Sequence, residues 1–191
     1  MSNWTKKWQT KHISEKELLD VVIPLCSGLE HVHQLGVIHR DIHGGNVILK
    51  NSDFRKPVIV DFGTARDFSI RELEENEEYQ TFQPIGAMSH RAPEKWMRPY
   101  AVGPESDVFS LGAMMYWCLS RQMPYRSEKS YLDLYRIIES GQHIPVRKLR
   151  QDVTEKTSQL IDAMIDPDLL TRVSTVAEVR KRAVAISQHL T

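Results

Sequence analysis

The sequence predicts a mainly helical α+β domain that carries one small β-ribbon. Helix-start signals recur along the 191 residues, whereas clear β-like runs occur at only two places, both early in the chain. The longest apolar run, at 108–119, is far too short to span a membrane and has the length of a buried helix. We therefore expect one mostly helical domain over residues 1–191, with a two-stranded ribbon at its functional site.

The first helix is predicted to begin at Ser14. Ser14 and Glu17 have the spacing of a capping box, in which each side chain accepts a hydrogen bond from the other residue's backbone N–H. Apolar residues then recur at helical spacing as one buried stripe, and Gly36 marks the expected end of the helix. The stripe consists of Leu18, Val22, Leu25, Leu29 and Val32.

Two short β-like runs follow, at 46–50 and 57–60. The connection between them is polar and contains the turn-forming residues Asn51, Ser52 and Asp53. We expect the two runs to form the ribbon. After Asp61 the strand signal almost disappears.

The later elements are predicted to be helices. The core helix is expected over about 106–119, and apolar residues within 154–165 predict another helix. Thr175 and Glu178 have the spacing of a second capping box, ahead of a last amphipathic helix. Repeats and low-complexity linkers are absent from the sequence, which favours a single domain.

Composition argues against several classes of partner. The chain has 25 basic and 25 acidic residues, so it lacks the broad positive field that binds nucleic acids or anionic membranes. Cys26 and Cys118 lie in apolar runs without metal-ligand spacing, and no basic and apolar leader opens the sequence. We therefore expect a cytoplasmic protein with no nucleic-acid partner and no membrane association.

Three short motifs carry the functional signal. In order along the chain they are His39-Arg40-Asp41-Ile42-His43-Gly44-Gly45-Asn46, Asp61-Phe62-Gly63 and Ala92-Pro93-Glu94. They resemble the catalytic loop (39–46), the metal-binding triplet and the end of the activation segment (61–94) of a protein kinase. The resemblance extends over nearly the whole chain and implies the fold of a protein-kinase C-terminal lobe.

The residues of these motifs suit phosphoryl transfer. That reaction needs a group that orients and deprotonates the acceptor hydroxyl, oxygen ligands for Mg²⁺, and positive charge near the phosphates. Asp41 suits the first task. Asn46 can offer a carbonyl oxygen to a hard cation, Asp61 a full carboxylate, and Gly63 the sharp turn that aims Asp61. The predicted cofactors are therefore ATP and Mg²⁺.

Other residues receive structural roles from the resemblance alone. Asp107, near the start of the core helix, is implied to hydrogen-bond the catalytic-loop backbone. Glu94 is implied to pair with Arg172 in a buried ion pair. His39 and Phe62 resemble the lower members of the apolar stack that joins the two kinase lobes.

Part of the kinase pattern is missing from this sequence. Only 38 residues precede His39, and they contain neither a Gly-x-Gly-x-x-Gly loop nor a Val-Ala-Ile-Lys strand. The resemblance therefore implies one lobe of a two-lobed enzyme, with the N-terminal lobe absent or supplied by a partner chain. Ile48 on the ribbon is implied to lie under the adenine ring, and Trp4 and Trp8 would face the missing lobe.

Two further features concern charge at the site. By resemblance, Arg40 receives a phosphate from the activation segment, with Tyr79 and Thr81 as the candidate phosphosites. His43 replaces the Lys usual in serine/threonine kinases, and Ala87 replaces the Thr that partners that Lys. We expect His43 to be a catalytic residue that contacts the transferred phosphate weakly, because an imidazole is only partly charged at neutral pH.

The sequence thus predicts a protein kinase that transfers the γ-phosphate of ATP to Ser or Thr hydroxyls of a protein substrate, with Tyr as second choice. Without the N-terminal lobe, the chain alone should be weakly active or inactive. Two alternatives stay open. One is a non-catalytic, pseudokinase-like interaction module, and the other is a small-molecule phosphotransferase, since such enzymes share the Asp-x-His-x-Gly-Asn pattern.

Overall fold

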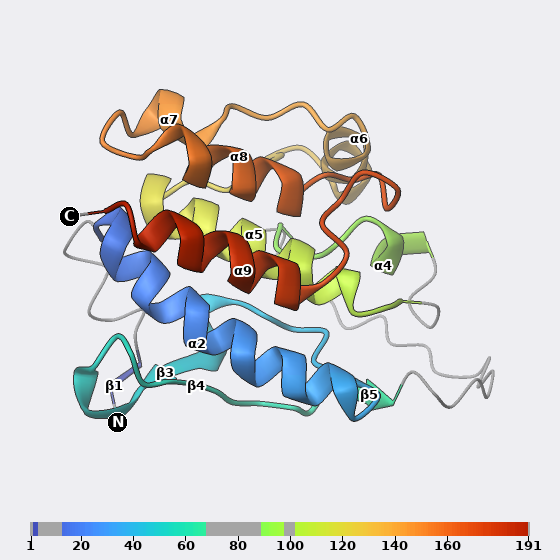
Figure 1. Ribbon diagram of the computed structural model, residues 1–191. Coiled ribbons are helices and arrows are strands. Elements are labelled where there is room, and N and C mark those ends of the chain that lie inside the picture. The colour runs from blue at the N-terminus through green and yellow to red at the C-terminus, as the bar shows by residue number, and fades with distance from the viewer. Residues whose placement is uncertain (1, 4–12, 68–88, 98–101, 191) are drawn as a thin grey trace.

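Helix α5 (Glu105–Ser120) forms the centre of the fold in the computed structural model, which describes residues 2–3, 13–67, 89–97 and 102–190 (Figure 1). From 106 to 119, every residue of α5 except Trp117 is buried. Gly112 allows α8 to approach closely, because a Cβ at this position would lie 2.7 Å from Met164 Cβ. The predicted helix at about 106–119 corresponds to α5.

Helix α2 (Glu15–Gln34) begins as predicted. Ser14 Oγ accepts a hydrogen bond from the N–H of Glu17, and the Glu17 carboxylate accepts one from the N–H of Ser14. The helix ends before Gly36, whose positive φ of 79° suits a residue without Cβ. Its apolar stripe packs mainly against α9 (Val176–Ser187), and the two helices lie side by side (Figure 1).

The remaining helices complete the C-terminal half. Helix α8 (Glu155–Met164) is capped by Thr154, and α9 is capped by Thr175, whose Oγ1 accepts from the N–H of Glu178. The second capping box forms only halfway, because the Glu178 carboxylate bonds Arg182 instead of the cap. No predicted element corresponds to α4 (Glu94–Met97), α6 (Tyr131–Glu139) or α7 (Val146–Leu149).

The two β-like runs pair as predicted, but the sheet is larger than a two-stranded ribbon. Strands β3 (Val47–Leu49) and β4 (Pro57–Ile59) are antiparallel, and β1 (Ser2–Asn3) adds a third strand next to β3. A separate pair joins β2 (Val37–Ile38) to β5 (Arg66–Asp67). The two-residue strands β1, β2 and β5 are too short to show a period-2 pattern, so tertiary position alone defines them.

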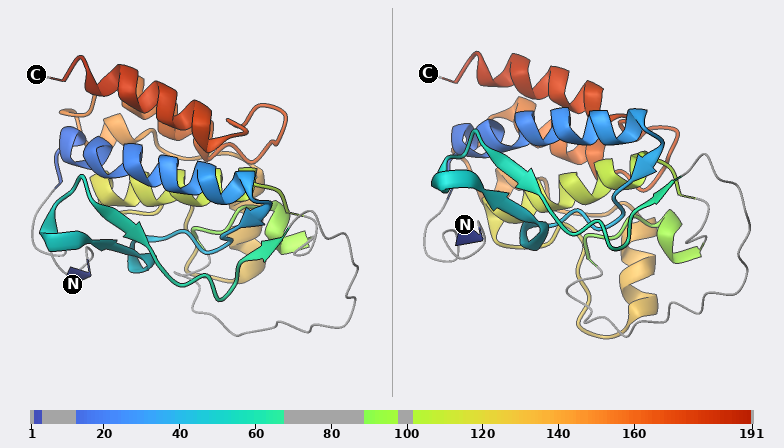
Figure 2. Two further views of the ribbon diagram at one scale, coloured as in Figure 1. Left: turned by 60° about the horizontal axis from the view of Figure 1, so that its bottom comes forward. Right: turned by 90° about the horizontal axis from the view of Figure 1, so that it is seen from below.

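These elements form layers around α5. Strands β3 and β4 run beside α2, and α8 and α9 lie on the other side of α2 (Figure 1). From below, the ribbon lies in front of α2 and α5 (Figure 2). None of the helices in the described residues is long and apolar enough to cross a membrane. The mainly helical fold class predicted from the sequence is confirmed. The 39–46 loop, with its one-turn helix η1 (Gly44–Asn46), lies between the ribbon and α5.

Candidate active site

Asp107 from α5 fixes the backbone of the loop that the sequence predicts to be catalytic. Its buried carboxylate accepts hydrogen bonds from the backbone N–H groups of His39 at 2.9 Å and Arg40 at 2.8 Å. His33, near the end of α2, donates from Nε2 to Asp107 Oδ2 at 2.9 Å. Three donors thus compensate the desolvated charge. Arg40 has a left-handed φ of 71°, so the chain turns sharply just before Asp41.

Asp41 is the carboxylate that this turn presents, and it is partly exposed. Its Oδ2 accepts a hydrogen bond from Asn46 Nδ2 at 3.1 Å and lies 3.4 Å from His43 Nε2. The hydrogen bond from His43 is the main cause that lowers the pKa of Asp41, and the charge of Lys95 and the Asn46 bond lower it further against the effect of burial. Asp41 is therefore ionised at neutral pH, the form that can accept a proton.

Asn46 and Asp61 lie at adjoining ends of β3 and β4. Val60, the neighbour of Asp61, donates its N–H to Asn46 O at 2.9 Å. Asn46 Nδ2 donates to the Asp41 carbonyl at 2.9 Å and to its carboxylate, so the amide oxygen of Asn46 is left for a cation. Asp61 is exposed and has a φ of 64°, and its Oδ1 accepts from Gly63 N–H at 3.2 Å.

This donor set fits Mg²⁺. One amide oxygen and one exposed carboxylate are hard ligands, and Mg²⁺ usually completes its octahedron with water and substrate phosphates. In the part of the chain that the structure describes, no group of three or more His, Cys, Asp or Glu side chains could hold a metal by itself. The residues therefore suit a nucleotide-bound ion rather than a closed structural metal site.

His39 and Phe62 pack against each other. Their ring centroids are 4.6 Å apart at an interplanar angle of 66°, with His39 fully buried and Phe62 43% exposed. His39 Nε2 lies 3.1 Å from Val60 O and can donate to it. Ile48 is half-buried on β3 and faces Val58 across the ribbon, and Val58 is 46% exposed. The ribbon thus presents an apolar surface next to the loop.

Glu94 and Arg172 join the start of α4 to the rest of the domain. Arg172 Nη1 and Nη2 donate to the two carboxylate oxygens of Glu94 at 2.8 and 3.0 Å. The guanidinium also donates to the carbonyls of Asp166 at 2.7 Å and Glu105 at 3.2 Å, and it stacks over the ring of Phe109. A buried arginine with this many acceptors holds three segments together.

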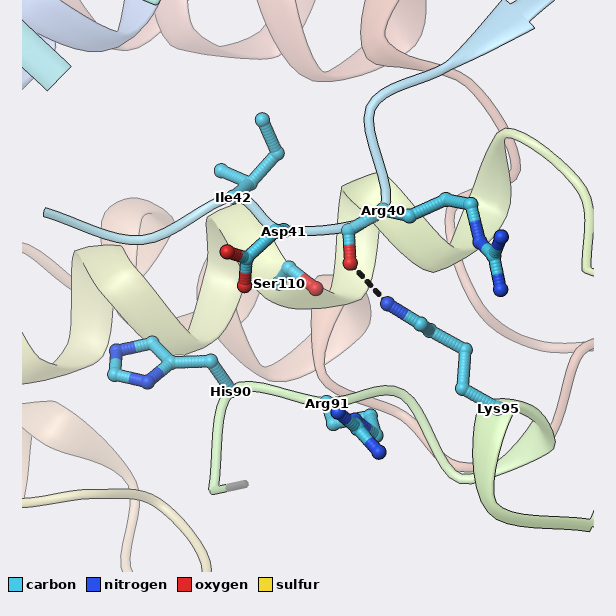
Figure 3. A pocket seen from close by; sticks show the side chains of 7 residues that line it. All are labelled: Arg40, Asp41, Ile42, His90, Arg91, Lys95 and Ser110. Carbon is cyan, nitrogen blue, oxygen red and sulfur yellow. Dashed lines mark hydrogen bonds between the residues drawn. The ribbon is translucent and has the colours of Figure 1, made fainter. Parts of the chain in front are cut away.

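A small cavity of about 10 Å³ lies next to Asp41 (Figure 3). Two of its lining residues, His90 and Lys95, have shifted pKa values and were not predicted as site residues from the sequence. The Lys95 ammonium donates to the Arg40 carbonyl, and burial, followed by the nearby Arg91 and Arg40, lowers the pKa of Lys95 to about 8. Burial, followed by the charge of His43, lowers the pKa of His90 to about 4. The lining residues are Arg40, Asp41, Ile42, His90, Arg91, Lys95 and Ser110.

No local pattern marks Lys95, since its contact joins residues that are 55 positions apart. Lys95 and Asp107 together hold the backbone of Arg40, because Asp107 accepts from its N–H and Lys95 donates to its carbonyl. The candidate phosphosites Tyr79 and Thr81 lie outside the described residues. Three further residues that the sequence analysis named, Ala87, Trp4 and Trp8, also lie outside the described residues.

The sequence of this chain is similar to the sequences of known proteins. The family model described as "Protein kinase domain" matches residues 2–184. The serine/threonine-protein kinase PknD of Chlamydia muridarum is 27% identical over 99% of this chain and 22% of its own length. PknB of Mycolicibacterium smegmatis, also a serine/threonine-protein kinase, is 26% identical over 92% of this chain and 27% of its own length. The chain thus spans about a quarter of these relatives.

Solved structures show the same fold. The Rad53 kinase domain with SCD2, in complex with AMPPNP, superposes with a TM-score of 0.68 and 22% identity, covering 89% of this chain and 59% of that one. A longer Rad53 chain, residues 1–466 with AMP-PNP, gives a TM-score of 0.71 and 21% identity over 93% of this chain and 42% of that one.

Proposed function

The chain belongs to the protein kinase family, and on that premise we propose that it transfers the γ-phosphate of ATP to Ser or Thr hydroxyls of protein substrates. The naming of PknD and PknB as serine/threonine-protein kinases favours these acceptors over Tyr. One observation carries the proposal. His43 and Asn46 both approach Oδ2 of Asp41, which leaves Oδ1 for a substrate hydroxyl.

In this mechanism Asp41 orients the acceptor hydroxyl and takes its proton as the oxygen attacks the γ-phosphate. Asp107 and Lys95 keep the loop backbone in place, so Asp41 needs little rearrangement when the substrate binds. Asn46 and Asp61 are proposed to hold Mg²⁺, which when bound neutralises charge on the phosphates. Arg40 is proposed to respond to negative charge on the activation segment, with Tyr79 or Thr81 as the modified residue.

ATP is the proposed nucleotide because both Rad53 structures contain an ATP analogue. We propose that the chain works together with a Gly-rich loop and a Lys-bearing strand, which these 191 residues do not contain. Ile48 would then form the lower side of the adenine pocket. On its own, the chain should be weakly active or inactive.

The proposed location is the cytoplasm. Cys26 and Cys118 are both buried free thiols, which suits a reducing compartment. Burial raises the pKa of Cys26 to about 12, so this thiol has little thiolate character.

A second candidate function is a non-catalytic interaction module. The observation that favours it is the exposed apolar surface of Val58 and Phe62, because soluble domains tend to cover such patches with a partner. His43, in place of the usual Lys, is compatible with this reading.

Radiolabel transfer from γ-labelled ATP to a generic protein substrate tests the proposal. The chain alone should transfer below about 1 per second, the lower end of the kinase range, and an added N-terminal lobe should raise the rate. With that lobe, Asp41→Asn should lower kcat at least about 100-fold, the usual contribution of a general base. Asp53→Asn, at a partly exposed aspartate in the β3–β4 turn, is the matched control and should change little. Near-full activity of Asp41→Asn would contradict the assignment.

A further inference from the structure

His43 is held between two partners that define which of its nitrogens carries the proton. Its Nδ1 accepts a hydrogen bond from the backbone N–H of Gly45 at 3.0 Å. A backbone N–H can only donate, so Nδ1 must present its lone pair. The proton of the neutral ring is therefore on Nε2. The imidazole takes the place of an Asx side chain in a turn, because it binds the N–H two residues ahead.

The proton on Nε2 faces Asp41. Nε2 lies 3.4 Å from Asp41 Oδ2, and a carboxylate oxygen can only accept. Asn46 Nδ2 reaches the same oxygen at 3.1 Å and the Asp41 carbonyl at 2.9 Å. Two donors on one oxygen restrict rotation of the carboxylate about χ1 and χ2. Oδ1, which receives neither donor, keeps a fixed direction.

Gly45 makes room for this arrangement. A Cβ at position 45 would lie 2.6 Å from His43 Cε1 and 2.8 Å from Nδ1, both closer than real Cβ atoms approach. Any side chain at 45 must therefore push the imidazole away from the position in which it reaches Asp41. Gly28 on α2 offers a contrast, because a Cβ there meets no atom within 4 Å.

We propose that His43 is a positioning residue that orients the Asp41 carboxylate through Nε2–H, with Gly45 as the second part of the same device. The proposal rests on the proposed function, in which Asp41 is the base. It differs from a contact between His43 and the transferred phosphate, since the ring's only free donor already faces Asp41.

Two amide variants separate the positioning role from a purely structural one. His43→Asn places an amide oxygen where Nδ1 lies and keeps the turn bond to Gly45, but its side chain is too short to reach Asp41. His43→Gln has a longer side chain and can place its NH₂ near the Nε2 position, where it donates to Asp41. A purely structural role in the turn predicts that His43→Asn keeps the wild-type behaviour, and the positioning role predicts that His43→Gln keeps it.

The first measurement needs no enzymatic activity. In the ¹⁵N-labelled protein, imidazole ¹⁵N–¹H correlations should show His43 as the Nε2–H tautomer. Coupling constants should show one χ1 rotamer for Asp41 in the wild type and in His43→Gln, and averaging in His43→Asn and Gly45→Ala. Gly28→Ala should match the wild type. An Nδ1–H tautomer, or an Asp41 rotamer that is equally fixed in all variants, overturns the proposal.

The second measurement is steady-state phosphate transfer by the protein with its N-terminal lobe. Misplacing the base should lower kcat by roughly tenfold or more in His43→Asn and Gly45→Ala, while KM for ATP stays unchanged. His43→Gln should recover most of that loss. A rise in KM for ATP with unchanged kcat would instead assign His43 to phosphate contact. If the wild type transfers no phosphate, the proposed function fails, and the first measurement still decides whether His43 orients Asp41.

Discussion

Glu94 and Arg172 lie 78 positions apart in the sequence and form a bidentate ion pair in which the Arg172 side chain is fully buried. Glu94 is the first residue of α4, and Arg172 follows α8, so the pair connects two segments that share no local sequence signal. Because both partners depend on each other for their compensating charge, loss of either one leaves a desolvated ion.

Glu94→Gln or Arg172→Leu should therefore destabilise the domain by about 3–5 kcal/mol, the range for a broken buried pair. Urea unfolding followed by circular dichroism measures this loss. Arg147→Ala is the matched control, because Arg147 and Glu155 form an exposed pair at 2.8 Å and such pairs contribute at most about 1 kcal/mol. Equal losses for the buried and the exposed pair would argue against this account.

Asp107→Asn should loosen the backbone of the 39–46 loop. The amide keeps one acceptor oxygen but turns an NH₂ toward backbone donors, so at least one buried N–H loses its partner, at about 1–3 kcal/mol. Hydrogen exchange should show faster exchange at the amides of His39 and Arg40. Asp20→Asn on α2 serves as the control, since the one ion pair of Asp20 among the described residues is a 3.8 Å contact with Arg55. Unchanged protection of the two loop amides in Asp107→Asn would refute the prediction.

His143 should make stability depend on pH. Burial lowers the pKa of His143, but its hydrogen bonds to Asp162 and to the Gly141 carbonyl, with the charges of Asp162 and Asp166, outweigh burial and raise it above 6.5. A raised pKa in the folded state stabilises the fold below the unfolded pKa, and this contribution is lost as pH rises through the folded value.

The difference in unfolding free energy between wild type and His143→Gln should consequently shrink from pH 5.5 to pH 8.5. Denaturant titrations at several pH values measure it. Asp162→Asn removes the principal hydrogen-bond partner and should flatten the same pH dependence. A difference that grows with pH would show that burial dominates instead.

The apolar surface of the ribbon should promote self-association or binding of a separate N-terminal lobe. Val58→Lys with Phe62→Ser should reduce both sedimentation of oligomers and binding of a dye for exposed apolar surface, because it removes the exposed part of the patch. Leu170→Ser is the control, since Leu170 is 93% exposed in the loop between α8 and α9, away from the ribbon. A wild-type chain that stays monomeric and binds no dye would count against the prediction.

The features that the sequence predicts correctly have local causes. The caps at Ser14 and Thr175 form because a hydroxyl meets an N–H three residues ahead, which sequence spacing alone encodes. The β3–β4 pairing also follows from two adjacent runs and a polar turn. The mainly helical class follows from these elements.

The features that the sequence does not predict depend on tertiary contacts. The pairing of β2 with β5 joins two-residue segments that carry no periodic pattern. The position of Lys95 depends on a contact with a carbonyl far away in the sequence. The orientation of His43 depends on the backbone N–H of Gly45, which binds Nδ1 and leaves Nε2 at 3.4 Å from Asp41 Oδ2, and residue identity alone does not predict this orientation.

The three hydrogen bonds to Asp107 also bear on how the protein is synthesised. The acceptor is made 67, 68 and 74 residues after the groups that it binds. Chains emerge from the ribosome with the N-terminal part first, and contacts this distant in sequence form only after the later partner has been translated. A nascent chain that has emerged only through β5 therefore carries every residue of the 39–46 loop but lacks the carboxylate that sets its backbone, and the candidate site forms only once α5 has left the exit tunnel.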